Sequence, residues 1–383
     1  MWRIVQSKMN LPIKRLLTTG QLLALMMLFS QSAIGQDKLQ SLEIEIRKIV
    51  KDTKAVGVSV ALISNYELVW AKGFGVTEIG TSDSVTTQTL FQAASISKPV
   101  TALAIVKKIQ EGKLFLNDNV DDRLTSWRVP KNNYTSSSAV TVKHLLSHTG
   151  GVANSYYHIP GYLETDQLPT IIDCLNGRMP AQNDPVKITA TPGTQFSYSN
   201  CGYWILEALL EDLEKRTFED LVADEILFPI GMANSTFESA PSNLKFKSIA
   251  AGHLDKNKLI DGKYYRIRPQ SSGGLWCTPT DLAKFLILIQ KSMKGDAIDI
   301  INKEYATLMT TPVMGSYGLG FSNEVRGTGV RFFGHDGHNL GYICSMIGSL
   351  DKGFGVVIMT NSENGWKAVN KIKKLVGRQF WGF

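Results

Sequence analysis

Cysteine is scarce in this sequence. The four cysteines are widely and irregularly spaced among 383 residues: Cys174, Cys201, Cys277 and Cys344. None has a histidine or a second cysteine at the intervals that metal sites use, so the sequence predicts no metal site and no cofactor. In an oxidising compartment the four could pair in three ways. We expect them to be small buried apolar side chains, and none has the surroundings of a nucleophile.

The apolar run in the N-terminal part of the sequence is shorter than a membrane span requires. The apolar run near the N-terminus, Leu22–Phe29, is too short to cross a bilayer. A basic flank precedes this run, and the small residues Ala33 and Gly35 follow it. This pattern predicts a secretory signal peptide over residues 1–35, cut before Gln36, with an uncleaved anchor as the alternative. We therefore expect a secreted or periplasmic protein with no stable membrane anchor after cleavage.

A strong excess of charge is absent once the signal peptide is removed. The formal net charge of +7 includes four basic residues in the leader, and the remaining chain carries +3. The basic residues near the C-terminus alternate with apolar ones at helical spacing, which indicates a solvated helix face. The sequence therefore predicts no nucleic-acid partner.

Hydrophobic periodicity predicts strands at both ends of the chain and helices in the middle. This order indicates an α+β fold: an antiparallel sheet flanked by terminal helices, with an inserted all-helical subdomain. The sheet part spans about residues 37–95 and 256–383, and the helical part about 96–255. A long irregular loop covers 152–197. Helices are predicted at 37–52, 99–109, 141–147, 202–215, 218–227, 282–293 and 366–378, and strands at 56–63, 68–76, around 332, at 341–349 and at 353–360.

The stretch Phe91–Val100 places Ser95 three residues before Lys98 at the start of a predicted helix. Residues i and i+3 share a helix face, so a hydroxyl group lies beside an amine. Backbone N–H groups at a helix start also favour developing negative charge. Taken alone, the pair is more typical of a surface serine beside a solvated lysine. Ser97 is not spaced to share this face with Lys98.

A serine is a weak nucleophile until a base takes its proton. Lys98 is one candidate base, provided that it is desolvated or close to other positive charge. A second candidate lies in an extended run that places Tyr198 and Asn200 on the same side. A lysine ammonium lowers the pKa of a nearby phenol, so a Tyr198 phenolate could deprotonate Ser95. Asn200 could hold Lys98 and the substrate, or simply cap the helix that begins near Gly202.

A third segment joins two predicted strands and contains His335, Gly337 and His338. Glycine allows a ligand to approach the backbone closely. The strand edge could therefore offer the His338 N–H to an oxyanion, opposite the Ser95 N–H. Two histidines with Asp336 also suggest a metal site, but the sequence supplies no further ligands for it. A plain hairpin with polar tips is the alternative interpretation.

Ser95-Ile-Ser-Lys98, Tyr198-Ser-Asn200 and His335-Asp-Gly337, in this order, resemble the three motifs of the serine β-lactamase/penicillin-binding superfamily. The Tyr-Ser-Asn form is similar to class C β-lactamases, D-alanyl-D-alanine carboxypeptidases, D-aminopeptidases and related esterases. The resemblance extends over about residues 40–365. It implies a β-lactamase/transpeptidase-like hydrolase domain over residues 36–383, with the site between the sheet and the helical subdomain. Further segments that resemble this superfamily lie at 145–151, 228–232, 273–282 and 317–321.

The resemblance implies a role for each site residue. Ser95 would be the nucleophile, Lys98 and Tyr198 would share the general-base role, and Asn200 would orient Lys98 and the substrate. The His338 N–H would complete an oxyanion hole. We also expect His335, Gly337 and Trp276 beside the substrate. Ser147 and His148 are adjacent at a helix end, where they do not face each other, so we expect them to be structural.

One departure from the superfamily pattern concerns His335, because β-lactamases and penicillin-binding proteins usually carry a lysine there. Histidine is mostly neutral at neutral pH, so it holds a substrate carboxylate less well. We therefore expect a secreted serine hydrolase that acts on an ester or a D-amino-acid amide or peptide. β-Lactamase or D-alanyl-D-alanine carboxypeptidase activity is the alternative. A hypothesis of another class is a non-catalytic scaffold that binds a cell-wall peptide or a partner.

Overall fold

The computed structural model describes residues 35–155, 160–242, 244–296, 299–327 and 329–382. All but the last residue of the expected signal peptide therefore lies outside the described residues. Within them, none of the helices has both the length and the apolar character that a bilayer span requires. All four cysteines are buried and unpaired, as expected for small apolar side chains.

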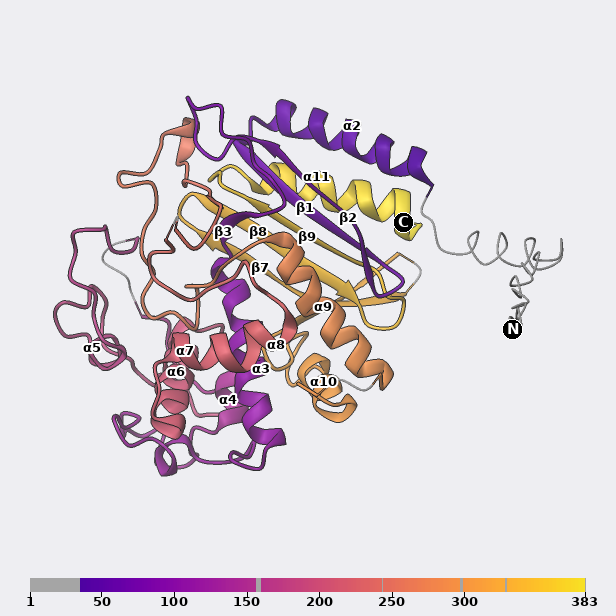
Figure 1. Ribbon diagram of the computed structural model, residues 1–383. Coiled ribbons are helices and arrows are strands. Elements are labelled where there is room, and N and C mark those ends of the chain that lie inside the picture. The colour runs from indigo at the N-terminus through magenta and orange to yellow at the C-terminus, as the bar shows by residue number, and fades with distance from the viewer. Residues whose placement is uncertain (1–34, 156–159, 243, 297–298, 328, 383) are drawn as a thin grey trace, which may run out of the picture.

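A six-stranded antiparallel sheet joins the two ends of the chain (Figure 1). The N-terminal hairpin pairs with the last strand, for example through Val60 opposite Ile358, which confirms the predicted assembly. The strand order is β2 (Glu67–Gly75), β1 (Gly57–Ser64), β9 (Gly355–Thr360), β8 (Tyr342–Ser349), β7 (Val330–Asn339) and β6 (Ser322–Arg326).

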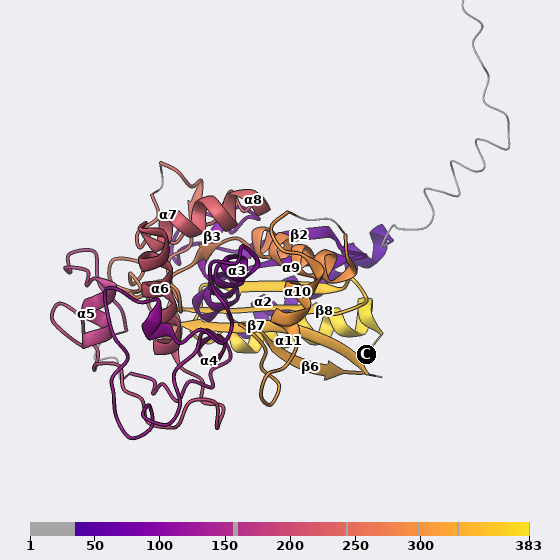
Figure 2. The ribbon, with the colours of Figure 1, turned by 90° about the horizontal axis from the view of Figure 1, so that it is seen from below.

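Both faces of this sheet are covered, and alternating side chains serve the two faces. Val58, Val60 and Leu62 of β1 pack under the terminal helices α2 (Gln36–Thr53) and α11 (Trp366–Val376). The residues between them belong to the core on the other face, where α9 (Pro279–Lys294) crosses the strands. Figure 2 shows α9 and α11 on opposite sides of the sheet. This double coverage explains why β8 and β9 are buried along their whole length.

A helical part lies beside the sheet and shares a continuous apolar core with it. Thr141, Thr217 and Thr278 cap the helices that follow them, as their sequence patterns predict. The predicted irregular loop at 152–197 contains one short helix, α5. The elements are α3 (Ser97–Gln110), α4 (Val142–Leu146), α5 (Ile171–Asn176), α6 (Asn200–Glu214), α7 (Phe218–Val222), the π-helical turn η3 (Ala223–Leu227) and α8 (Phe228–Ile230).

A few elements are not predicted by the sequence pattern. One is α10 (Lys303–Thr310), which packs on α9 and α3. Another is a small sheet in the order β4 (Ser248–Ile249), β3 (Thr89–Gln92) and β5 (Trp276–Cys277). Strands of two to four residues are too short to show a period-2 pattern, which is why the sequence does not reveal them.

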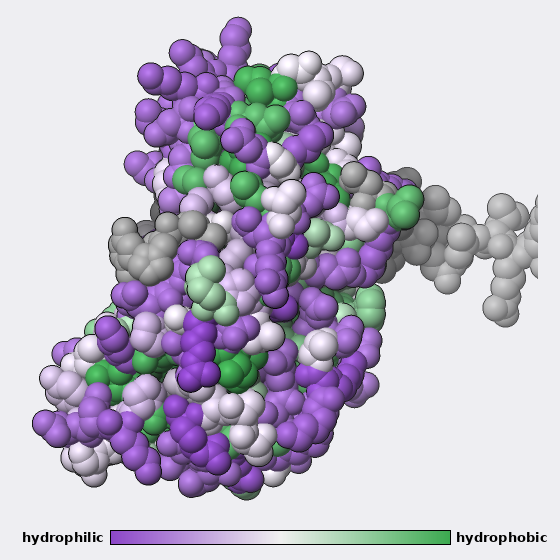
Figure 3. Space-filling model, turned by 90° about the vertical axis from the view of Figure 1, so that its left-hand side faces the viewer, coloured by the Kyte–Doolittle hydropathy of each residue, from purple (hydrophilic) through white to green (hydrophobic). Residues whose placement is uncertain are grey.

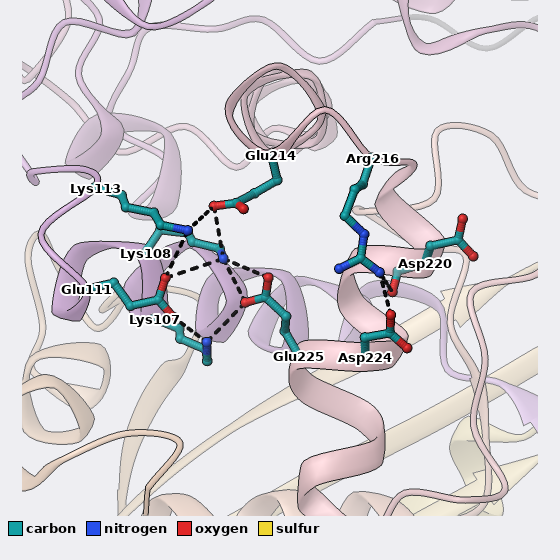
Figure 4. Close-up of polar contacts among 9 residues, drawn as sticks. All are labelled: Lys107, Lys108, Glu111, Lys113, Glu214, Arg216, Asp220, Asp224 and Glu225. Carbon is teal, nitrogen blue, oxygen red and sulfur yellow. Dashed lines mark hydrogen bonds and ion pairs between the residues drawn. The ribbon is translucent and has the colours of Figure 1, made fainter.

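The C-terminal ends of α3 and α6 are held together by a charge cluster (Figure 4). The Lys108 side chain is almost fully buried, and its Nζ lies 3.0 Å from Glu214 and 2.7 Å from Glu225. Lys107 and Lys113 approach the same two carboxylates from the protein surface. Because α3 and α6 both begin at the site described below, this cluster fixes the position of one helix against the other.

On the face that Figure 3 shows, hydrophobic side chains form small patches separated by hydrophilic ones. Small, scattered patches of this kind are normal on a protein surface.

Candidate active site

Ser95 lies on a one-turn 3-10 helix, η1 (Ala94–Ile96), between β3 and α3. Ala94 has a φ of +48°, which is uncommon for a residue with a side chain and is typical of strained functional sites. Ser97 points into the protein, where its Oγ donates to the Ala94 carbonyl and accepts the Leu275 N–H. Of the two serines, only Ser95 lines a cavity.

Lys98 is fully buried behind Ser95. Its Nζ lies 3.1 Å from Ser95 Oγ and 2.8 Å from the Ser272 carbonyl oxygen. Among the residues that the structure describes, no carboxylate forms an ion pair with it. Burial lowers the pKa of Lys98 well below its usual value, and the nearby Cys201 opposes this only in part. An amine that is desolvated and has no counter-ion favours the neutral form, which can accept a proton.

Tyr198 also lies close to Ser95, whose side chain acts on the pKa of the phenol. Burial raises the pKa of the Tyr198 phenol to about 12, and the influence of Ser95 offsets this only in part. The expectation of a lowered phenol pKa is therefore wrong. It assumed a lysine ammonium beside the ring, whereas Lys98 is itself driven toward its neutral form. The Lys98 Nζ lies 4.9 Å from the centre of the Tyr198 ring.

An aromatic layer that the sequence did not reveal supports Tyr198. The His148 ring lies 4.3 Å from the Tyr198 ring, and Tyr203 and Tyr317 pack around the same histidine. The His148 Nδ1 accepts the Ser199 N–H, which fixes the backbone next to Tyr198. Ser147 bonds instead to Thr149 and to a carbonyl, so the structure brings no Ser147–His148 pair together. His148 acts through packing, and no sequence motif identifies such a role.

His335 is buried and has both ring nitrogens occupied. Nε2 lies 3.1 Å from the Tyr317 hydroxyl, and Nδ1 bonds the Asp336 carbonyl oxygen. Burial lowers the pKa of His335 to about 4. His335 is thus neutral at physiological pH. It is not among the side chains that line the Ser95 cavity.

Gly337 faces η1, and the close approach of β7 to that turn explains why a glycine stands there. A Cβ at this position would lie 2.4 Å from the Ala93 carbonyl oxygen and 2.5 Å from the Cys344 sulfur. A side chain would therefore push β7 away from Ser95. Gly337 thus contacts the turn that carries Ser95 and does not line the cavity itself.

The orientation of the His338 backbone follows from strand alternation on β7. The Arg331 carbonyl bonds Leu350 beyond β8, and the Gly334 carbonyl bonds Ser322 of β6. Even-numbered residues of β7 therefore direct their N–H groups toward the β6 side. Pairing with β6 ends at Gly334, so the His338 N–H faces a free strand edge beside the cavity.

The cavity beside Ser95 has a volume of about 240 Å³. Asn200 and His338 line it, together with Ser272 and Gly273. In the described part of the chain, no hydrogen bond joins the Asn200 side chain to Lys98, and Ser272 supplies the carbonyl that Lys98 uses. Trp276 lies elsewhere: it is buried in β5 between Tyr264 and Tyr342 and does not line this cavity.

A buried carboxyl group, Glu207, stands behind the loop that holds Lys98. Its Oε2 accepts the Ser271 N–H at 2.7 Å. Burial raises the pKa of Glu207 to about 7, although the Ser271 N–H and the charge of Arg268 both lower it. Nothing in the three motifs points to this residue. Its position within the apolar face of α6 is the only signal that the sequence offers.

The family model of the beta-lactamases matches residues 43–376. This chain belongs to the beta-lactamase family. Members of this family are serine hydrolases, and the mixed fold of antiparallel sheet and helices is the one that the motifs implied.

Penicillin-binding protein 4 of Amycolatopsis lactamdurans is 27% identical over 304 residues, covering 75% of this chain and 76% of that protein. Protein flp of Staphylococcus aureus (strain MW2) is 25% identical over 226 residues, which are 57% of this chain. The match spans only 42% of the flp sequence.

Solved structures of the same fold include two informative neighbours. The octameric penicillin-binding protein homologue from Pyrococcus abyssi is 28% identical, with a TM-score of 0.72 over 88% of this chain and 77% of that one. The D-amino acid amidase from Ochrobactrum anthropi SV3 has a TM-score of 0.71 over 89% of this chain and 99% of that one. At 20% identity the amidase shows the shared fold alone.

Proposed function

We propose that this beta-lactamase-family hydrolase uses Ser95 as its nucleophile and acts on an ester or a D-amino-acid amide or peptide. The single observation that carries the proposal is the contact between Ser95 Oγ and Lys98 Nζ, 3.1 Å apart, with the lysine buried and its pKa lowered. A neutral amine at that distance is a base for the serine proton.

Acylation begins when Ser95 Oγ attacks the substrate carbonyl carbon and its proton passes to Lys98 Nζ. The carbonyl oxygen becomes an oxyanion, which the N–H groups of Ser95 and His338 stabilise from two sides. Lys98 keeps its bond to the Ser272 carbonyl throughout, so the ammonium that forms has a fixed acceptor.

Collapse of the tetrahedral intermediate expels an alcohol or an amine, which needs a proton. Tyr198 is neutral and lies beside both Ser95 and Lys98, so it donates this proton and is reprotonated by Lys98. Water then attacks the Ser95 ester, and the same two side chains return its proton to the serine. In this account Lys98 is the base and Tyr198 the proton relay.

One observation supports the substrate class. In the third motif, His335 takes the sequence position at which related β-lactamases and penicillin-binding proteins carry a lysine, and its pKa of about 4 leaves it uncharged. β-Lactamase or carboxypeptidase activity remains the second candidate, favoured by the similarity to penicillin-binding protein 4.

We also propose that the protein works outside the cytoplasm, on the basis of the basic flank, the short apolar run and the Ala33–Gly35 cleavage pattern. Expression of the full chain followed by cell fractionation and N-terminal sequencing tests this. Mature protein that begins at Gln36 in the periplasm or medium supports it. An uncut chain in the cytoplasm contradicts it.

A substrate panel on one purified sample tests the proposed reaction. Chromogenic p-nitrophenyl esters, D-amino-acid anilides and nitrocefin are compared, with Ser95→Ala as the control. We expect turnover of an ester or a D-anilide that exceeds turnover of nitrocefin and disappears in the control. Binding of a muropeptide without turnover of any substrate would instead favour a non-catalytic scaffold.

A further inference from the structure

Arg268 gives the Ser95 cavity a charge that the three motifs do not predict. Among the described residues that line the cavity it is the only lysine or arginine, and none of the others is an aspartate or a glutamate. His338, which also lines the cavity, bonds Glu363 at 2.7 Å. The second oxygen of Glu363 accepts the Gly341 N–H, so both oxygens of this carboxylate are engaged.

The Arg268 guanidinium has donors to spare. One nitrogen donates to Gln270 Oε1 at 2.8 Å, while Nε is buried without a hydrogen-bond partner. Within the described residues no carboxylate lies at ion-pair distance. A guanidinium carries five N–H donors, so a ligand in the cavity that accepts from the donors not used by Gln270 gains binding energy. A guanidinium offers a planar fork that matches a carboxylate.

The side chain is also held in place before any ligand arrives. Gln270 is fully buried, and its amide nitrogen bonds Glu219 at 2.8 Å and the Phe237 carbonyl oxygen. That leaves Gln270 Oε1 fixed as the anchor of Arg268. The charge of Arg268 acts on two carboxyl groups of α6, Glu207 and Glu211, and burial raises the pKa of both, so they neutralise the arginine only in part.

We propose that Arg268 is an anion-recognition residue and that the cavity takes substrates bearing a carboxylate at the end that reaches the wall formed by Gly161 and Tyr162. Arg268 lies on that wall, because Arg266 two residues earlier pairs with Tyr162. A substrate with a free ammonium at the same end meets a like charge and no carboxylate. This inference rests on the proposed function and narrows it to acylated, anionic substrates.

The test compares three anilides that differ in the group on the D-alanine nitrogen, which is anionic, neutral or cationic: N-succinyl-, N-acetyl- and unsubstituted D-alanine p-nitroanilide. We expect kcat/KM to be about tenfold higher or more for the succinyl than for the acetyl compound, as charged hydrogen bonds commonly give. The unsubstituted amine should be the poorest of the three. The preference should shrink in 0.5 M salt, because salt screens partly exposed charges.

Variants assign the preference to Arg268. In Arg268→Met, which keeps an apolar stem, the succinyl-to-acetyl ratio should fall to about one, while Arg268→Lys should keep an intermediate ratio. Arg216→Gln is the matched control, because Arg216 pairs with Asp224 at the far end of α6 and should leave the ratio unchanged. A ratio near one in the parent protein, or an unchanged ratio in Arg268→Met, overturns the inference.

Failure of the Arg268 inference can be distinguished from failure of the proposed function. If the anilides are not hydrolysed but a fluorophosphonate probe labels Ser95, protection from labelling decides instead: N-succinyl-D-alaninamide should protect better than N-acetyl-D-alaninamide, and only with Arg268 present. Equal protection by the two amides counts against Arg268. A folded protein whose Ser95 is not labelled counts against the proposed function itself.

Discussion

Replacement of Lys98 by methionine should remove catalytic activity while changing the stability of the fold much less. The two polar contacts of Nζ are Ser95 Oγ and the Ser272 carbonyl oxygen, both inside the protein. Loss of a general base lowers kcat by about 10²- to 10⁴-fold. Loss of the bond to the Ser272 carbonyl destabilises the fold by about 1–3 kcal/mol, since that acceptor stays buried.

A second term works in the opposite direction. The pKa of Lys98 is lowered by burial, so the folded parent must give up a proton that the unfolded chain keeps at neutral pH. The cost of giving up this proton on folding acts against the contribution of the lost hydrogen bond. We expect Lys98→Met to be inactive, and to lose less stability at pH 7 than the lost hydrogen bond alone would cost.

The effect of Lys98→Met on the unfolding free energy should depend on pH. A group with a depressed folded pKa contributes stability above its unfolded value and loses it as the pH falls. The unfolding free energy of Lys98→Met relative to the parent should therefore rise as the pH is lowered from 10 toward 6. Urea denaturation across this range measures it, with p-nitrophenyl ester hydrolysis as the activity assay.

Lys108 supplies a matched control, because it is a second buried lysine on the same helix but has carboxylate partners. Lys108→Met leaves Glu225 and Glu214 without their central cation, so it should lower the unfolding free energy by about 3 kcal/mol. If instead Lys98→Met is as destabilising as Lys108→Met and the effect does not vary with pH, Lys98 is an ammonium in the fold and its role as a base is wrong.

Three further predictions concern neighbours of the site. Gly337→Ala places a Cβ 2.4 Å from the Ala93 carbonyl oxygen, so it should slow ester hydrolysis and lower the unfolding free energy in urea by about 1–3 kcal/mol. Gly202→Ala is the control, because its Cβ meets nothing closer than 3.6 Å. Equal effects of the two substitutions would refute the steric argument. Tyr198→Phe should slow leaving-group departure more than attack, so release of p-nitroaniline should fall more than release of the better leaving group p-nitrophenol; equal losses for amide and ester would contradict the relay role. Glu207 has a raised pKa of about 7, so its stabilising contribution is full below pH 4.5 and is lost as the pH rises to 7. The unfolding free energy of Glu207→Gln relative to the parent should therefore increase over that range. A difference in unfolding free energy that does not change with pH would show that Glu207 is not buried in its neutral form.

The sequence predicts those parts of the fold that have strong periodicity. Strand β9 is a sustained apolar run, α2 has its apolar residues on one face, and Thr141, Thr217 and Thr278 are recognisable caps. The two-residue strands β4 and β5 leave no pattern, because their place in the sheet is set by tertiary contacts. The pairing of β1 with β9 follows from the strand arrangement and not from either strand alone.

The site is predictable to the extent that its residues lie close in sequence. Ser95 and Lys98 share one helical turn, and the structure places their polar atoms 3.1 Å apart. The electrostatic environment is different, because it depends on burial. Tyr198 has a raised pKa where a lowered one was expected, and that reversal follows from the burial of both Tyr198 and Lys98. Contributions from remote segments, such as the Ser272 carbonyl, become visible only once the chain is folded.

The most direct test of the account is covalent labelling of Ser95 by a fluorophosphonate, followed by peptide mass analysis. We predict a single adduct on Ser95 with none on Ser97, a labelling rate that rises with pH as Lys98 loses its proton, and a rate at least a hundredfold lower in Lys98→Met. An adduct elsewhere, or labelling of Ser95 that proceeds unchanged in both Lys98→Met and Tyr198→Phe, would contradict the proposed activation of Ser95.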